Sequence, residues 1–105
     1  MVGMSDIQKV ADRIVREFDP ERVVLFGSHA EGTAGRDSDV DLLVVLPFRE
    51  KPFRKSLEIL NAIDVRFPID LIARRPSDVR RRYREGDPLI REALDRGKVL
   101  YERDR

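Results

Sequence analysis

The chain has 105 residues, of which 41% are hydrophobic, with a formal net charge of +1 and no cysteine. This length suits one compact domain, so residues 1–105 are expected to form a single unit. The lack of cysteine excludes disulfides and thiolate metal sites, and a single histidine, His29, excludes most zinc sites. A bound metal must therefore use oxygen ligands, which favours Mg²⁺ or Mn²⁺.

The sequence contains no candidate membrane segment. No stretch approaches the roughly 18 uninterrupted apolar residues of a membrane span. The segment from Met1 to Val10 lacks the basic flank and the apolar run of a signal peptide. We therefore expect a cytoplasmic protein.

The first half of the chain predicts a helix, two strands and a glycine-containing loop. Apolar residues at helical spacing predict a helix over residues 5–18, with Ser5 as its N-cap. The β-branched and aromatic run at 22–26 predicts a core strand. Residues 28–38 are polar and predict a loop that opens with a short helix. The most apolar run, residues 40–46, predicts a second strand.

The second half predicts two more strands and further helices. Helical spacing predicts a long helix over 53–65, and an apolar run predicts a strand over 69–73. A cap at Ser77 begins a basic helix over 77–83, a proline opens a helix over 89–94, and a short strand follows at 98–101. The order of elements predicts an α/β fold, with a small mixed sheet packed by helices.

Two groups of side chains have ordinary structural explanations. Phe53, Leu57 and Leu60 are expected to lie in the core. A cluster of arginines could bind RNA or an acidic partner, but a solvated helix face is the favoured interpretation because aromatic residues for base stacking are scarce there. The cluster consists of Arg74, Arg75, Arg80, Arg81, Arg82 and Arg84.

Two carboxylates, Asp39 and Asp41, stand at the start of the most apolar strand. Alternate residues of a strand share one face, so the two side chains point the same way. A charge beside a buried strand is normally paired or bound to a metal. The pair is therefore a candidate cation site.

Three familiar glycine-rich or acidic loops are excluded by particular residues. A phosphate-binding P-loop would match Gly27 and Gly32, but Thr33 stands where lysine is required. A calcium loop beginning at Asp37 would need glycine where Leu42 stands. A dinucleotide fingerprint fails because the chain contains no Gly-x-Gly.

The remaining arrangement suits a nucleoside triphosphate. Gly27 lets backbone amides approach a phosphate, and Ser28 adds a hydroxyl donor. Asp70, in the strand over 69–73, is a third carboxylate. Carboxylates facing a triphosphate require divalent cations between them, as in two-metal sites. Asp39 and Asp41 would be metal ligands, and Asp70 would share a second metal or help to take the proton of the acceptor.

These residues also carry a family resemblance. Gly27 and Ser28, followed after ten residues by Asp39-Val-Asp41 and later by the strand of Asp70, resemble the minimal nucleotidyltransferases (MntA-like antitoxins) of the DNA polymerase beta superfamily. The similarity spans nearly the whole chain and implies a polymerase-beta-like fold. It implies phosphate contacts by Gly27 and Ser28, metal binding by Asp39 and Asp41, and a third acidic role for Asp70. The implied reaction is magnesium-dependent transfer of a nucleotidyl group from a triphosphate, with release of pyrophosphate.

The resemblance also implies a partner. Small stand-alone members of the family look like the antitoxin half of two-gene modules, whose partner is an all-helical HEPN-domain ribonuclease toxin. Known members act as protein adenylyltransferases that transfer AMP from ATP to a tyrosine of that partner. The alternatives are a binding antitoxin with a vestigial site and an RNA-binding module that uses the arginines. The sequence leaves open the nucleotide, the acceptor and whether the chain forms homo- or hetero-oligomers.

Overall fold

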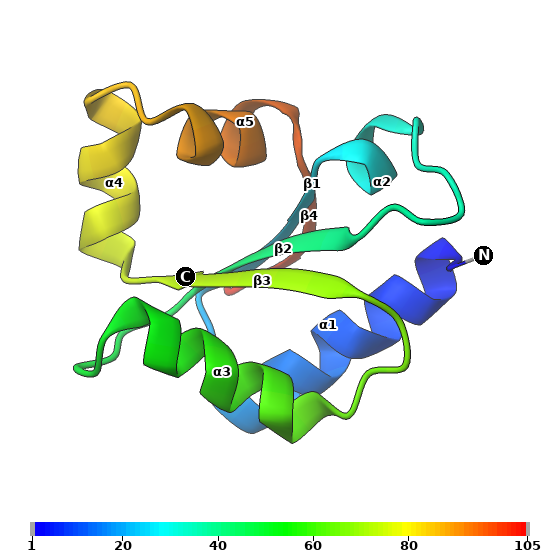
Figure 1. Ribbon diagram of the computed structural model, residues 1–105. Helices are drawn as coiled ribbons and strands as arrows, with labels where there is room; N and C mark the ends of the chain where they lie inside the picture. The colour runs from blue at the N-terminus through cyan, green and yellow to red at the C-terminus, as the bar shows by residue number, and fades with distance from the viewer. Residues whose placement is uncertain (1, 105) are drawn as a thin grey trace.

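A four-stranded sheet lies between two layers of helices in the computed structural model, which describes residues 2–104 (Figure 1). The strands are β1 (Arg22–Phe26), β2 (Val40–Val45), β3 (Ile69–Arg74) and β4 (Lys98–Glu102). The helices are α1 (Met4–Phe18), α2 (Ser28–Glu31), α3 (Pro52–Ile63), α4 (Pro76–Arg84) and α5 (Pro88–Arg96). The predicted α/β class with a small mixed sheet is confirmed.

The sheet has the order β3-β2-β1-β4, with β3 and β4 as its edges. Strand β1 runs antiparallel to both β2 and β4, whereas β2 and β3 are parallel. The last residue of β1, Phe26, is therefore the register partner of Asp41, and Asp41 is the partner of Asp70. The carboxyl end of β1 thus meets the amino ends of β2 and β3 at one end of the sheet.

Alternation along the strands divides the core between the two faces of the sheet. Val23, Leu25 and Leu42 pack with α1 and α3, whereas Phe26 and Leu43 pack with α4 and α5. Because β1 and β2 are covered on both faces, their sequences are nearly continuous apolar runs rather than alternating ones. Within residues 2–104, no helix is long and apolar enough to cross a membrane.

Two predicted helix starts are wrong by one or two residues. Helix α1 begins at Met4 rather than after Ser5, and its N-cap is Gly3, whose N–H donates to Asp6 Oδ2 at 3.0 Å. Helix α4 begins at Pro76, ahead of the predicted cap at Ser77. Proline is well placed there because the first N–H of a helix has no intrahelical partner.

The expectation that Phe53 and Leu57 lie in the core is wrong, since their residues are 72% and 41% exposed. The side of α3 that packs inward carries Ser56 and Ile59. Ser56 is tolerated in the core because its hydroxyl donates to the Pro52 carbonyl at 2.9 Å and accepts the Ala73 N–H at 3.0 Å. A serine with both hydrogen bonds satisfied therefore lies on the buried side of α3, and Phe53 and Leu57 turn outward.

Several arginines of the basic cluster are occupied by contacts within the chain. The Arg75 guanidinium donates to the Phe48 and Glu50 carbonyls at 2.9 and 2.8 Å. Arg81 pairs with Asp78 and Arg82 with Asp87, each at 3.1 Å. These contacts support the structural interpretation of the cluster over an RNA-binding one.

Asp87 holds the start of α5, and its replacement is expected to destabilise the fold. Its Oδ1 accepts the N–H groups of Leu89 and Ile90 at 3.0 and 3.1 Å. These bonds, that of Ile90 foremost, hold the pKa of Asp87 below its ordinary value. Asp87→Ala should lower the free energy of unfolding at neutral pH by about 1 kcal/mol, as measured by urea denaturation.

The effect should depend on pH in one direction. Because the folded-state pKa of Asp87 is depressed, its stabilisation is present above the unfolded-state pKa of roughly 3.9 and is lost as the pH falls through the folded-state value. Asp87→Asn, which keeps an acceptor oxygen, is the control and should retain much of the stability. Equal stability of the alanine variant and the wild type at neutral pH would contradict this role of the cap.

Candidate active site

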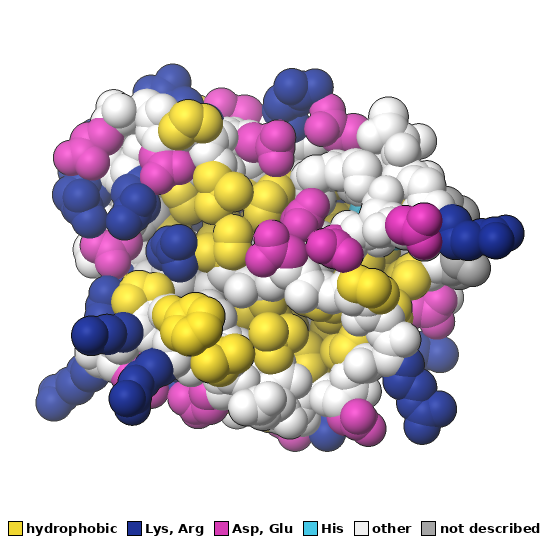
Figure 2. Space-filling model, in the orientation of Figure 1, with side chains coloured by type: hydrophobic (Ala, Val, Ile, Leu, Met, Phe, Trp, Pro, Cys, Tyr) yellow, Lys and Arg dark blue, Asp and Glu magenta, His cyan; other side chains and the backbone are white. Residues whose placement is uncertain are grey.

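Three carboxylates meet at the end of the sheet where β2 and β3 begin. Asp41 and Asp70 are register partners on neighbouring strands, and Asp39 precedes β2 with the same alternation as Asp41. Side chains two positions apart in a strand lie on the same face of the sheet. Leu43 and Ile72 pack with α4 and α5, so the three carboxylates also lie on the face that these helices cover. Figure 2 shows a group of acidic side chains over β2 and β3. The predicted site residues are therefore brought together by the sheet.

The negative charges of this acidic group repel one another. The pKa of Asp41 is raised, first by partial burial and then by the neighbouring charges of Asp70, Asp39 and Glu92. Ionisation of Asp41 is costly for both reasons, since burial removes water and like charges repel. A bound cation would relieve this repulsion, which is the electrostatic condition expected of a metal site.

Gly27 lies directly against the Asp41 carboxylate. A Cβ atom added at Gly27 would lie 2.2 Å from Asp41 Oδ2, so no side chain fits while the carboxylate keeps this position. The backbone of Gly27 also has φ 75° and ψ −156°, a conformation that other residues rarely adopt. Glycine is therefore required both to turn the chain after β1 and to admit the carboxylate.

Ser28 begins the short helix α2 immediately after this turn. The Gly27 carbonyl accepts the N–H groups of Ala30 and Glu31 at 3.1 Å, which starts the helical bonding. The earlier N–H groups, those of Ser28 and His29, have no intrahelical acceptor because they precede the first helical bond. These amides and the Ser28 hydroxyl are donors close to the acidic group, which suits the phosphates of a nucleotide.

The donor set fits a hard divalent cation. Within residues 2–104, no three carboxylate or histidine side chains form a ready-made metal cage. Mg²⁺ does not require one, because it keeps several waters and binds through one or two carboxylates together with substrate phosphates. Asp39 and Asp41 supply such carboxylates on one face, with Asp70 beside them.

Two residues near the site were not assigned a role from the sequence. Glu92, on α5, adds a fourth negative charge that acts on Asp41. His29 lies half-buried in α2, the predicted short helix, with Nε2 3.3 Å from the Ser38 carbonyl oxygen. That contact joins α2 to the loop that leads to Asp39. The packing of α5 on the sheet brings Glu92 here, so local sequence patterns could not reveal it.

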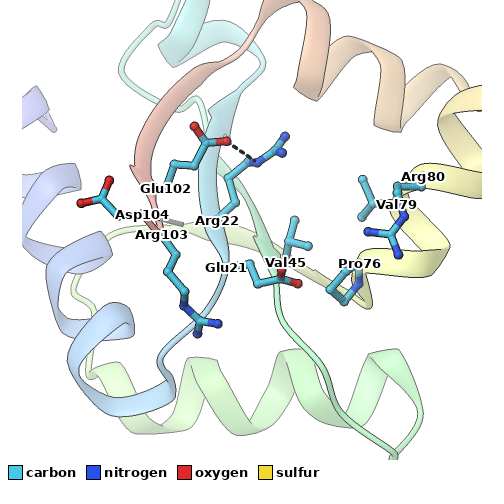
Figure 3. A pocket seen from close by; sticks show the side chains of 9 residues that line it. All are labelled: Glu21, Arg22, Val45, Pro76, Val79, Arg80, Glu102, Arg103 and Asp104. Carbon is cyan, nitrogen blue, oxygen red and sulfur yellow. Dashed lines mark ion pairs between the residues drawn. The ribbon is translucent and has the colours of Figure 1, made fainter.

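A separate cavity of about 120 Å³ lies at the opposite end of the sheet (Figure 3). Arg22, the first residue of β1, and Val45, the last of β2, line it together with residues of α4 and β4. Its walls carry both charges, including an ion pair between Arg22 and Glu102 at 3.3 Å. None of the predicted site residues borders this cavity.

Known proteins share both the sequence pattern and the fold. Residues 7–100 match the model of the nucleotidyltransferase domain family. The chain is 39% identical over 88 residues to "Putative protein adenylyltransferase MJ1305" of Methanocaldococcus jannaschii, an alignment that covers 78% of this chain and 58% of that protein. The chain thus spans little more than half of that relative's length.

Solved structures show the same fold at low sequence identity. A crystal structure of "a putative nucleotidyltransferase from Sulfolobus solfataricus" gives a TM-score of 0.67 at 19% identity, covering 95% of this chain and 80% of that one. A toxin-antitoxin structure with AMP-PNP gives 0.59 at 20% identity, covering 92% and 74%. The toxin-antitoxin structure MntA-HepT gives 0.55 at 15% identity, covering 96% and 74%.

The family match extends over nearly the whole chain and includes Asp39, Asp41 and Asp70. The structural similarities agree with it in fold. The chain therefore belongs to the nucleotidyltransferase domain family of the DNA polymerase beta superfamily.

Proposed function

We propose that the chain is an active nucleotidyltransferase, that it transfers AMP from ATP to a tyrosine hydroxyl of a HEPN-type partner protein, and that it so acts as the antitoxin of a two-gene module. The observation that carries the proposal is the convergence of Asp39, Asp41 and Asp70 beside the close approach of Gly27 to Asp41. The relative from M. jannaschii carries a protein adenylyltransferase name, and two of the structural neighbours are toxin-antitoxin complexes. Both similarities favour a protein acceptor.

The proposed reaction is a displacement at the α-phosphorus of ATP. The acceptor oxygen forms a bond to this phosphorus, the bond from the phosphorus to the bridging oxygen of pyrophosphate breaks, and pyrophosphate leaves with that electron pair. The proton of the acceptor hydroxyl passes to a base, for which Asp70 is the proposed group. One or two divalent cations bound at the site would neutralise the triphosphate and lower the pKa of the attacking hydroxyl.

The residues of the chain have separate roles in this reaction. Asp39 and Asp41 are proposed to hold the cation, and the partial burial of Asp41 strengthens its binding because water screens that charge less. Gly27 and Ser28 are proposed to donate hydrogen bonds to phosphate oxygens. Asp70 is exposed at the sheet edge, where a bulky acceptor can reach it.

The proposal is tested by incubating the full chain with ATP, Mg²⁺ and the HEPN-type protein encoded beside it. Label in the α-phosphate should be transferred to a tyrosine of the partner, whereas label in the γ-phosphate should leave with pyrophosphate. Asp39→Asn should abolish transfer, and Asp12→Asn, at an exposed acid on α1, is the matched control.

Two outcomes would count against the proposal. Absence of transfer from any nucleoside triphosphate would exclude an active enzyme. If Asp39→Asn inhibits the toxic activity of the partner as well as the wild type does, the chain is instead an antitoxin that works by binding alone.

A further inference from the structure

A groove of about 510 Å³ runs along the free edge of β3 and opens between this strand and α3. Its lining includes the exposed residues Phe53, Leu57 and Asp70. Figure 2 shows hydrophobic side chains gathered over α3, next to the acidic group on the sheet. Asp70 belongs to both places, so a molecule bound in the groove would lie beside the proposed active site.

The edge of β3 offers an unsatisfied pair of backbone groups. The Pro68 and Arg74 carbonyls accept the N–H groups of Val40 and Leu46. By alternation, the backbone N–H and carbonyl groups at positions 69, 71 and 73 point away from β2. The Ala73 N–H donates to the Ser56 hydroxyl, and its carbonyl accepts from the Arg74 guanidinium at 2.9 Å. Leu71 has no such partner within residues 2–104, although the residue is only 6% exposed.

An unpaired edge of this kind is able to bind an extended segment as an additional strand. The N–H and carbonyl of Leu71 would bond to the backbone of that segment. Its side chains would alternate, one set facing Phe53 and Leu57 on α3, and the other set standing beside Asp70 and Arg74. The first set must therefore be apolar.

Arg74 determines the charge of the segment. Its guanidinium lines the groove and donates to the Ala73 carbonyl. The two acids whose charges act on Arg74 are paired with other arginines, Asp78 with Arg75 at 3.2 Å and Asp87 with Arg82 at 3.1 Å. No carboxylate among residues 2–104 forms an ion pair with Arg74, and a half-buried cation in this state favours an acidic residue on a binding partner.

We infer that the groove between α3 and the edge of β3 binds an extended, acidic and apolar segment of the acceptor protein as a fifth strand. The inference rests on the proposed function for the identity of that protein. Register places the acceptor hydroxyl opposite Asp70 and an acidic side chain opposite Arg74, four positions away along the strand. Apolar residues alternate with them and pack on Phe53 and Leu57.

The test uses the full chain and a short synthetic peptide. In the peptide, tyrosine and glutamate are four positions apart and valines alternate with polar residues. A second peptide has the same residues in reverse order, because the added strand could run parallel or antiparallel to β3. Binding is followed by fluorescence anisotropy. Replacing the glutamate of the peptide by lysine should weaken binding about tenfold, as expected for a charge interaction near 1.4 kcal/mol. Arg74→Glu should restore binding of the lysine peptide. Binding should also slow hydrogen exchange of the Leu71 amide.

Two exposed apolar residues provide a matched pair of variants. Phe53→Asp should abolish peptide binding, whereas Val99→Asp, on the opposite edge strand β4 where the residue is 57% exposed, should leave it unchanged. The inference would be overturned if replacing the glutamate of the peptide by lysine did not change the affinity. It would also be overturned if the peptide did not slow hydrogen exchange of the Leu71 amide. A dimer of the free chain that Phe53→Asp dissociates would overturn it as well, because a second copy would then occupy the groove.

Different results would contradict the proposed groove and the proposed function. Peptide binding does not require Asp39, so Asp39→Asn should bind the peptide normally while losing transfer. If the HEPN-type partner is labelled equally by wild type, Phe53→Asp and Arg74→Glu, the groove is not the acceptor site although the function stands. If the peptide binds with the charge dependence given above and no nucleotide is transferred to any acceptor, the groove stands and the function fails.

Discussion

Asp41→Asn is expected to reduce nucleotidyl transfer by about 100-fold or more while raising the melting temperature of the metal-free protein by a few degrees. Transfer is lost because a cation and the developing charge on the phosphate both depend on this carboxylate. Stability rises because burial and the charges of Asp70, Asp39 and Glu92 raise the pKa of Asp41, so its ionised form destabilises the folded state. Transfer assays and thermal unfolding in the presence of a chelator measure the two effects.

The sign of the stability change follows from linkage. A carboxyl whose folded-state pKa is raised loses its contribution to stability as the pH rises through the folded-state value, so at neutral pH the charge is a cost. The neutral asparagine removes that cost in a side chain of the same shape. Mg²⁺ should stabilise the wild type and have little effect on Asp41→Asn. A variant that is less stable and fully active would refute this account of Asp41.

Gly27→Ala is expected to abolish transfer and to lower the free energy of unfolding by about 1–3 kcal/mol. The new Cβ would lie 2.2 Å from Asp41 Oδ2, so either the carboxylate or the start of α2 must move. The positive φ of 75° adds strain for any residue other than glycine. Transfer assays and chemical denaturation would measure the two losses.

Gly32→Ala is a control that introduces backbone strain without a steric clash. Gly32 has a similar φ of 78°, but an added Cβ would meet no atom within 4 Å. This control should therefore lose stability and retain transfer. If both variants lose stability and both keep transfer, the contact between Gly27 and Asp41 has no part in the reaction.

The strands and the acidic pair could be predicted because their signals are local. An unbroken apolar run identifies β2, and alternation along a strand is enough to place Asp39 and Asp41 on one face. Family resemblance supplied the pairing of this motif with Gly27. The sequence did not reveal that Gly27 contacts Asp41, because that contact depends on the antiparallel register of β1 and β2.

Features that depend on the packing of distant segments were missed. Glu92 reaches the site because α5 covers the face of the sheet on which Asp41 lies. Phe53 was expected in the core because it is large and apolar at helical spacing. The buried side of α3 instead includes Ser56, whose hydroxyl accepts the Ala73 N–H of β3. Helical periodicity alone cannot identify a polar residue as buried when its hydrogen-bond partner lies in a distant strand.

The central claim is that Asp39, Asp41 and Asp70 bind a divalent cation beside Gly27. It can be tested without knowledge of the acceptor by adding Mn²⁺ and ATP to the isotope-labelled chain and recording backbone amide spectra. Paramagnetic broadening should be strongest at Gly27, Asp41 and their neighbours in β3, and Asp41→Asn should remove it. Broadening centred elsewhere on the chain, or none at saturating Mn²⁺ and ATP, would contradict the claim.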